Sequence, residues 1–145
     1  MKVLLQRVSQ ASVVINQQTF ASIQHGLLAF IAVEHDDTML TAKAMAKKVA
    51  HYRMFADQQQ KMNLNVQQVS GAVLVVSQFT LAADTASGLR PSFSNAANHQ
   101  LSFSLYQAFC QHLAAFELKV ACGEFAADMQ VTLTNDGPAT FLLSL

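Results

Sequence analysis

The sequence predicts one domain that combines α and β structure, with a largely antiparallel sheet packed against two main helices. The first 33 residues contain short apolar segments separated by polar turns, which is typical of antiparallel strands. Residues 39–52 and 99–116 carry apolar residues at spacings of three and four, which is typical of helices. A length of 145 residues with 52% hydrophobic content suits a substantial core, so we expect residues 1–145 to form a single domain.

The opening sheet and the first helix are predicted from the first 52 residues. Four segments are expected as antiparallel strands, namely residues 2–9, 12–16, 19–24 and 26–33. Thr38 and the two aspartates before it supply N-cap chemistry for a helix over residues 39–52.

The second half of the chain is expected to place one helix between strands. The apolar run of residues 72–79 is rich in valine and suits a strand buried on both faces. The helix over residues 99–116 has its apolar stripe at Leu101, Leu105, Phe109, Leu113 and Phe116. Strands are expected at residues 120–122, 129–134 and 140–145, with a turn at residues 135–138 between the last two.

Charge and hydropathy limit the partners and the location of the protein. Nine basic and nine acidic residues cancel, so any contact with RNA must be local. The charged fraction of 12% is low for so small a chain, and the excess of apolar residues suggests burial between subunits, most simply in a homodimer. The apolar patch near Met1 is too short for a signal peptide, and no later run approaches about 20 apolar residues. We therefore expect a cytoplasmic protein with no membrane partner.

The sequence contains none of several common catalytic motifs. There is no GxSxG elbow, no HExxH, no zinc-ligand spacing and no glycine-rich phosphate loop, so no metal or cofactor is expected. The five histidines are scattered without a partner at a useful offset. Cys110 and Cys122 form no CxxC unit and are expected to be reduced core residues.

One candidate site remains at residues 77–81, where the buried run ends in Ser77, Gln78, Phe79 and Thr80. Polar groups at a buried strand end need partners, which are either neighbouring backbone groups or a ligand. Hydroxyls in such places commonly bond to backbone, and Phe79 would then be a core residue. The pair Gly137 and Pro138 likewise has a local interpretation as a tight turn, with the usual trans peptide.

Several blocks in order make the sequence resemble the D-aminoacyl-tRNA deacylases, the proofreading family first described through D-tyrosyl-tRNA hydrolysis. The blocks are Gln6-Arg7-Val8, residues 61–66 (Lys-Met-Asn-Leu-Asn-Val), residues 75–82 (Val-Val-Ser-Gln-Phe-Thr-Leu-Ala), Arg90-Pro91-Ser92-Phe93, residues 125–129 (Phe-Ala-Ala-Asp-Met) and Asn135-Asp136-Gly137-Pro138. The resemblance covers essentially the whole chain. It implies an α/β fold of the α+β type, with a mixed, largely antiparallel, barrel-like sheet and two main helices, assembled as a homodimer.

The resemblance also implies an active site shared by two subunits. Residues 77–80 of one subunit face the Gly137-Pro138 pair of the other, which in the family is a cis peptide whose carbonyl oxygens point into the pocket. These carbonyls would capture the amino group of a D-aminoacyl moiety and exclude an L side chain. Because glycine has no side chain to reject, glycyl-tRNA mischarged on tRNA(Ala) is expected to be cleaved too.

Without a visible base, we expect water to attack the ester with help from the neighbouring 2′-hydroxyl of the tRNA. Gln78, the Phe79 backbone and Thr80 would arrange and stabilise the carbonyl, while Thr80 remains the rival candidate for a nucleophile. By resemblance, Phe125 and Met129 belong to the pocket wall. Arg7 would hold the Gly-Pro loop of the partner or form a surface ion pair.

Three further expectations remain open. Lys43, Lys47 and Lys48 would follow tRNA phosphates or form a solvated helix face. The competing class of protein is a non-catalytic RNA-binding dimer module. A second enzymatic alternative is a hydrolase of another small acyl ester.

Overall fold

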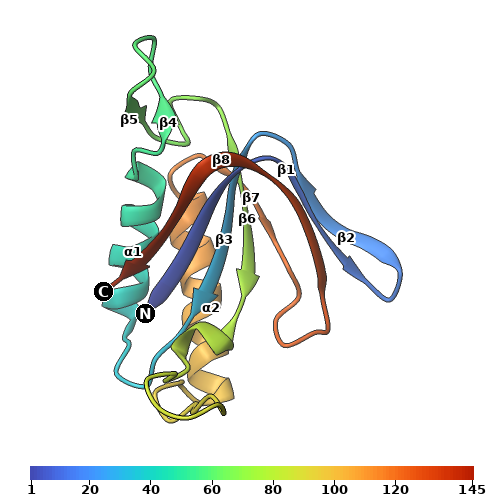
Figure 1. The fold of residues 1–145 in the computed structure, drawn as a ribbon, viewed down its shortest axis with the longest axis vertical. Coiled ribbons are helices and arrows are strands. Elements are labelled where there is room, and N and C mark those ends of the chain that lie inside the picture. Colours follow the sequence, from blue (N-terminus) through green and yellow to red (C-terminus); the bar gives the residue numbers. More distant parts are fainter.

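The computed structural model describes residues 1–145. Six strands form one curved, barrel-like mixed sheet, and two helices cover one of its faces (Figure 1). The strand order is β2-β1-β3-β6-β7, and β8 pairs with the other edge of β1. A small hairpin of β4 (Phe55–Ala56) and β5 (Met62–Leu64) extends beyond the end of the first helix. The predicted α+β class, with a mixed barrel-like sheet and two helices, is confirmed.

β1 (Lys2–Ile15) is one strand of 14 residues, so the expected division at residues 10–11 is wrong. Its first half pairs with β3 (Gly26–Ala32) and its second half with β2 (Gln18–Ile23). The exposed Ser9 and Gln10 lie where β1 changes partner, which explains their polarity. The strand continues through them because β8 pairs with β1 along its other edge.

β8 (Gln130–Ser144) is also continuous, which corrects the expected turn at residues 135–138 and the two separate strands beside it. Gln6 pairs with Thr140 and Val8 pairs with Asn135, so residues 136–139 of β8 lie opposite Arg7 alone. We call residues 136–139 the Gly-Pro bulge. A bulge accepts the proline in a strand because the missing N–H falls where the ladder is already interrupted.

The centre of the sheet is parallel. β6 (Ala72–Ser77) lies between β3 and β7 (Lys119–Cys122) and runs parallel to both. Its four central residues are fully buried, as the apolar run predicts. The strand ends at Ser77 rather than at residue 79, and a short 3₁₀ turn, η1 (Phe79–Ala82), follows it. Gly26 is needed where β3 meets β6, since a Cβ there would lie 1.9 Å from the Ala72 carbonyl oxygen.

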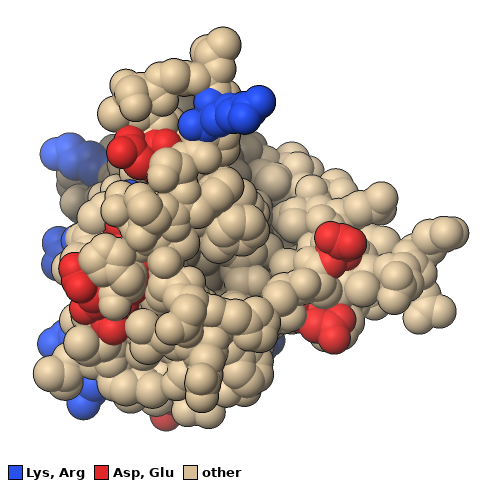
Figure 2. All heavy atoms as spheres, turned by 90° about the horizontal axis from the view of Figure 1, so that it is seen from below, with Lys and Arg blue, Asp and Glu red and all other residues tan.

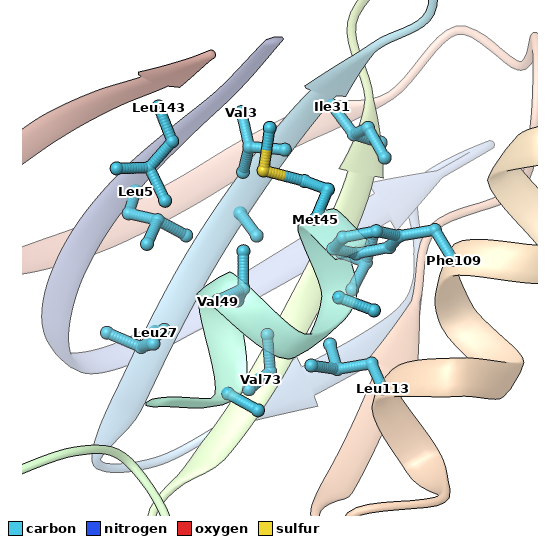
Figure 3. Packing of buried hydrophobic residues seen from close by; sticks show 14 of the residues in the cluster. Val3, Leu5, Leu27, Ile31, Met45, Val49, Val73, Phe109, Leu113 and Leu143 are labelled. Atoms are coloured by element: carbon cyan, nitrogen blue, oxygen red, sulfur yellow. The ribbon is translucent and has the colours of Figure 1, made fainter. Parts of the chain in front are cut away.

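The helices lie within two residues of their expected bounds. α1 (Met39–His51) begins with a capping box between Thr38 and Thr41, and the side chain of Asn98 caps α2 (His99–Ala114). Both helices bury an apolar stripe against the sheet and against each other (Figure 3). A second, smaller core fills the concave face of the sheet, around Val8, Leu28 and Leu74.

The two ends of the chain meet at the edge of the larger core, to which Met1 and Leu143 belong. The Met1 ammonium group donates to the Asp37 carboxylate at 2.6 Å, to Glu34 at 3.0 Å and to the Leu145 carbonyl at 3.0 Å. No buried side-chain nitrogen or oxygen lacks a partner. Neither α1 nor α2 has the length and apolar character that a membrane-crossing helix requires.

Candidate active site

A cavity of about 510 Å³ opens where β3 and β6 end and α2 begins. Twelve of its 17 lining residues are hydrophobic, which is typical of a site for a small organic group. Ile31, Val33 and Val76 come from the strand ends, and residues 125–129 from the segment between β7 and β8. The cavity therefore lies at the carboxyl ends of two parallel strands, where small ligands commonly bind in α/β sheets.

Ser77, Gln78 and Phe79 line this cavity. The backbone N–H of Gln78 donates to the Ile31 carbonyl at 2.7 Å, which prolongs the pairing of the two strands by one residue. The strand then turns sharply, because Phe79 begins η1. The first N–H groups of such a turn have no partner within it, which makes the amides of Phe79 and Thr80 candidates to bind a ligand oxygen.

Thr80 is exposed and does not line the cavity, although it directly follows residues that do. Its hydroxyl oxygen accepts a short hydrogen bond from the Gln78 side-chain amide. The Phe79 ring is 59% exposed and stacks in a tilted geometry on Phe93, with 5.2 Å between ring centroids. The four residues therefore form one polar and aromatic rim, but only three of them contact the cavity.

Phe125 and Met129 line the cavity on the opposite side, as the resemblance implied. The Phe125 ring is the centre of an aromatic cluster, with centroids 5.2 Å from His99, 5.3 Å from Phe103 and 5.5 Å from Tyr106. Sequence reasoning missed this cluster. The three partner rings lie on α2 at spacings of four and three, and that spacing was the available signal.

Tyr106 connects two segments that lie beside the cavity. Its hydroxyl lies 3.1 Å from the carbonyl oxygens of both Val75 and Gly123, and so it joins the end of β6 to the segment after β7. Burial, together with the neighbouring Cys110 and Cys122, raises the pKa of the Tyr106 hydroxyl, which stays protonated and available as a donor. A Cβ on Gly123 would lie 2.7 Å from the Met129 sulfur, so a larger residue here would displace the Met129 side chain.

The two thiols beneath Tyr106 are free, which confirms the expectation of reduced cysteines. The hydrogen bond with Cys122, together with burial, raises the pKa of the Cys110 thiol. Cys110 is therefore not poised as a nucleophile. Nowhere in the chain do three or more His, Cys, Asp or Glu side chains gather where they could hold a metal ion.

Two ionisable side chains of the cavity wall, His99 and Asp128, were not predicted as site residues. His99 is the first residue of α2 and packs edge-on against Phe125, while Asp128 directly precedes Met129. Both are exposed, and neither forms an ion pair. His99 is therefore a candidate base that the sequence did not reveal, because its only useful neighbours come from distant segments.

The Gly-Pro bulge lies apart from the cavity of its own chain. The Gly137-Pro138 peptide is cis, both residues are exposed, and neither lines the cavity. A Cβ on Gly137 would lie 2.6 Å from the Asn135 side-chain oxygen. Asn135 in turn donates to the Arg7 carbonyl at 2.9 Å, so its position is already determined.

Arg7 holds the Gly-Pro bulge of its own chain. Its Nε donates to the Asp136 carbonyl at 2.8 Å and lies 3.0 Å from the Asp136 carboxylate, and its Nη1 donates to the Met54 carbonyl at 2.7 Å. Arg7 thus forms the ion pair that was one of its two expected roles. The expected residues fall into two groups in one chain, one around the cavity and one at the bulge.

Comparisons with known proteins identify the family of the chain. A sequence model described as D-Tyr-tRNA(Tyr) deacylase matches residues 4–144. A D-aminoacyl-tRNA deacylase of Saccharophagus degradans (strain 2-40) is 56% identical over 145 residues, covering 100% of both chains. One of Colwellia psychrerythraea (strain 34H) is 55% identical over 142 residues, covering 98% of both.

Two solved structures share the fold. The structure of a c-Myc DNA unwinding element binding protein superposes with a TM-score of 0.94 at 32% identity, covering 100% of this chain and 99% of the other. A probable eukaryotic D-amino acid tRNA deacylase superposes with a TM-score of 0.87 over 98% of this chain and 97% of the other. The identity in the second pair is only 16%, so that likeness concerns the fold alone.

The fold and the cavity define a single-domain α+β protein with a cleft that suits a small organic group beside a polar strand end. Within that class, the chain belongs to the D-Tyr-tRNA(Tyr) deacylase family, a family of hydrolases. The resemblance inferred from the sequence is confirmed, and so is the expectation of a hydrolase.

Proposed function

We propose that this hydrolase cleaves the ester bond of D-aminoacyl-tRNA and releases the free D-amino acid and tRNA. The observation that carries the proposal is the geometry at the end of β6, where Ser77, Gln78 and Phe79 line an apolar cavity beside backbone amides. An aminoacyl group requires such a site, with apolar walls for the side chain and donors for the carbonyl oxygen. Membership of the deacylase family supports the choice of ester.

The proposed active site is shared between the subunits of a homodimer. Within one chain, Gly137 and Pro138 are exposed and lie outside the cavity, so they are available to a second chain. Large apolar side chains such as Phe79, Phe93 and Phe103 are exposed around the cavity, and a subunit interface would bury them. In the dimer, the Gly-Pro bulge of one subunit closes the cavity of the other.

Chiral selection follows from this closure. The carbonyl oxygens of Gly137 and Pro138 accept hydrogen bonds from the amino group of the substrate, and the nearby backbone leaves no space for an L side chain. A D side chain points toward the wall formed by Phe125 and Met129. Glycine lacks the rejected group, so glycyl-tRNA mischarged on tRNA(Ala) is also a substrate.

In the proposed reaction, a water molecule attacks the ester carbonyl. The water oxygen bonds to the carbonyl carbon, the bond from that carbon to the ribose oxygen breaks, and the 2′-hydroxyl helps to transfer the proton to the leaving oxygen. The Phe79 amide stabilises the developing oxyanion, with Ser77 and Gln78 orienting the ester. Removing one such donor in a hydrolase costs about 100 to 1,000-fold in turnover, so backbone donors suffice as principal contributors.

Thr80 is the rival nucleophile, and its contacts argue against that role. Its hydroxyl oxygen accepts a hydrogen bond from the Gln78 amide group, and an amide donor cannot remove the hydroxyl proton. Thr80→Ala should therefore retain hydrolysis. Loss of hydrolysis with intact substrate binding, together with a trapped acyl-Thr80 intermediate in the parent enzyme, would reverse the assignment.

One experiment separates the proposed activity from its alternatives. The purified protein is incubated with a D-aminoacyl-tRNA, the matching L-aminoacyl-tRNA and a simple D-amino-acid ester. Rapid loss of the first substrate alone supports the deacylase. Equal cleavage of the simple ester indicates a hydrolase of small acyl esters, and binding of tRNA without cleavage indicates a non-catalytic module.

The non-catalytic alternative has one specific observation in its favour. The 32% identical neighbour is described as a DNA unwinding element binding protein, which is a statement about nucleic-acid binding. A nucleic-acid contact and hydrolysis are compatible on one fold, so the cleavage assay decides between the functions.

A further inference from the structure

The surface of α1 has a charge distribution that the proposed reaction does not use. Lys43, Lys47 and Lys48 lie on this helix and Arg53 closely follows it, while no acidic residue occurs from residue 38 to residue 56. We call these four residues the basic face. None of them forms an ion pair with an acidic side chain. In Figure 2, Lys and Arg side chains lie together with Asp and Glu on the left side of the molecule, whereas the charged atoms on the arm at the right are those of Asp and Glu.

The simplest explanation of these positive charges is a solvent-exposed helix face whose cations interact favourably with the helix dipole. It accounts for Lys48, whose ammonium group donates to the Ser144 carbonyl at 3.1 Å. It does not account for Lys43, Lys47 and Arg53, which are exposed and have no side-chain partner in the chain. In a protein with equal numbers of acidic and basic residues, these three cations are a local surplus.

α1 lies beside β8, the strand that carries the Gly-Pro bulge (Figure 1), and the Lys48 ammonium group contacts Ser144 near the end of that strand. At the end of α1, the Tyr52 ring packs on Phe141 with 5.4 Å between centroids. One residue beyond Arg53, the Met54 carbonyl accepts a hydrogen bond from Arg7, and the same guanidinium group holds Asp136 of the bulge. The end of the basic face and the Gly-Pro bulge are therefore joined through one side chain.

The opposite end of α1 leads toward the cavity of the same chain, and it is acidic. Glu34, Asp36 and Asp37 precede the helix, and Glu34 forms a bridge with Ala96, which lines the cavity. Hydrogen bonds from the Met1 ammonium group and Lys2 outweigh partial burial and lower the pKa of Glu34, so its carboxylate stays charged. The Met1 ammonium group and Lys2 pair with Glu34 and Asp37, so this end of α1 has no surplus of positive charge. A polyanion that follows the basic face is therefore favoured toward the bulge.

We propose that the basic face binds the phosphate backbone of the tRNA acceptor stem, and that it does so for the active site of the other subunit. The subunit that supplies the Gly-Pro bulge would also hold the RNA, while its partner supplies the cavity. This inference rests on the proposed function, because it needs a site shared by two chains. It adds a surface that binds RNA, and it assigns RNA binding and the cavity to different subunits.

The first experiment tests the RNA contact. Lys43→Gln, Lys47→Gln and Arg53→Gln are combined, and hydrolysis of D-aminoacyl-tRNA is measured from 50 to 200 mM salt. Each lost phosphate contact lowers the slope of log affinity against log salt by about 0.7 to 0.9, so the triple variant should lose about 2 to 3 from the slope of log(kcat/KM). Hydrolysis of a D-aminoacyl-adenosine, which has no stem, should be unchanged.

The matched control is Lys119→Glu combined with Gln24→Glu, which changes the net charge by the same three units at exposed positions on the β7 and β2 side. It should keep the parent salt slope. An equal decrease of the slope in both variants would show a general charge effect and contradict a specific contact. An unchanged slope in the α1 variant would overturn the proposed contact between the basic face and the RNA.

The second experiment assigns the contact to a subunit. Gly137→Val in one chain and Ser102→Trp, which fills the cavity, in the other each inactivate their own homodimer. A mixed dimer then regains one site, built from the cavity of the first chain and the bulge of the second. The basic-face substitutions should lower the salt slope by about 2 to 3 when they are placed in the Ser102→Trp chain and leave it intact in the Gly137→Val chain.

The outcomes separate the two proposals. A mixed dimer without activity contradicts the shared site itself, and with it this inference. In the other outcome, the mixed dimer is active and loses its salt slope when the basic-face substitutions are in the Gly137→Val chain. That result supports the shared site and contradicts only the assignment of the RNA contact to the subunit that supplies the bulge. If the Ser102→Trp chain does not fold, Ser77→Phe is the second cavity-filling variant.

Discussion

Arg7 contacts Asp136 twice, through a hydrogen bond of 2.8 Å from its Nε to the carbonyl oxygen and an ion pair of 3.0 Å with the carboxylate. The third contact of the same guanidinium group, 2.7 Å to the Met54 carbonyl, fixes it from the other side. Only 12% of the Arg7 side chain is exposed, whereas half of Asp136 is. The arginine is thus a rigid support for the Gly-Pro bulge, and the carbonyl contacts matter more than the half-exposed ion pair.

Replacing Arg7 should therefore misplace the bulge. Arg7→Lys cannot reach Met54 and Asp136 together, because an ammonium group lacks the planar fork of a guanidinium group. We expect a loss of about 1–3 kcal/mol in the free energy of unfolding, together with a fall in kcat/KM for D-aminoacyl-tRNA. Denaturant unfolding and steady-state kinetics measure the two effects.

Asp136→Asn is the control for this substitution, because it keeps the backbone carbonyl and removes only the charge. Its stability should stay within about 1 kcal/mol of the parent protein. A larger loss for Asp136→Asn than for Arg7→Lys would mean that the ion pair, rather than the carbonyl contacts, supports the bulge.

The sequence predicted those elements whose residues carry a strong local pattern. The apolar run before Ser77, the capped helix after Thr38 and the apolar stripe around Phe109 all lie within about two residues of their expected positions. Each of these signals is local, because the spacing of apolar residues and the capping side chains both belong to a single helix or strand.

The errors arose where pairing between distant strands decides the structure. Asn135-Asp136-Gly137-Pro138 has the composition of a turn, but β1 pairs with the chain on both sides of it and draws it into one strand. For the same reason Ser9 and Gln10 do not break β1. In the cavity, Ser77 was a candidate because it ends the buried apolar run, and Met129 was predicted through the family resemblance. His99 was missed because only the packing of α2 on Phe125 brings it there.

Gly137→Ala should reduce both rate and chiral discrimination. The added Cβ would lie 2.6 Å from the Asn135 side-chain oxygen, and Asn135 is held by its bond to the Arg7 carbonyl. The bulge must then shift, which displaces the carbonyls proposed to capture the amino group. Matched D- and L-aminoacyl-tRNAs measure the effect as a lower ratio of the two kcat/KM values. Unchanged rate and unchanged ratio would remove Gly137 from the site.

Tyr106→Phe should lower the free energy of unfolding and change how that free energy depends on pH above neutrality. Loss of the hydroxyl removes the donor shared by the Val75 and Gly123 carbonyls, of which Val75 still accepts from the Gly123 N–H, at a cost of about 1–3 kcal/mol near neutral pH. Because the pKa of Tyr106 is raised in the folded protein, its contribution to stability is complete below about pH 10 and falls above it, as the unfolded tyrosine ionises first. The difference in free energy of unfolding between parent and variant should therefore shrink from pH 9 to pH 11. A constant difference over that range would contradict the buried, protonated hydroxyl.

His99→Gln tests whether the protein or the RNA supplies proton transfer. His99 is the imidazole of the cavity wall, and a general base contributes typically 100 to 10,000-fold to a rate. If water attack depends on the tRNA 2′-hydroxyl, His99→Gln should change kcat by less than about 10-fold, and its profile of kcat against pH should keep the parent shape. A substrate with a terminal 2′-deoxyadenosine should instead lose at least 100-fold with both proteins, within the range expected for loss of proton transfer. A loss of that size caused by His99→Gln, with the deoxy substrate still cleaved by the parent enzyme, would assign the base to the protein, because glutamine occupies a similar volume and packs on Phe125 without accepting a proton.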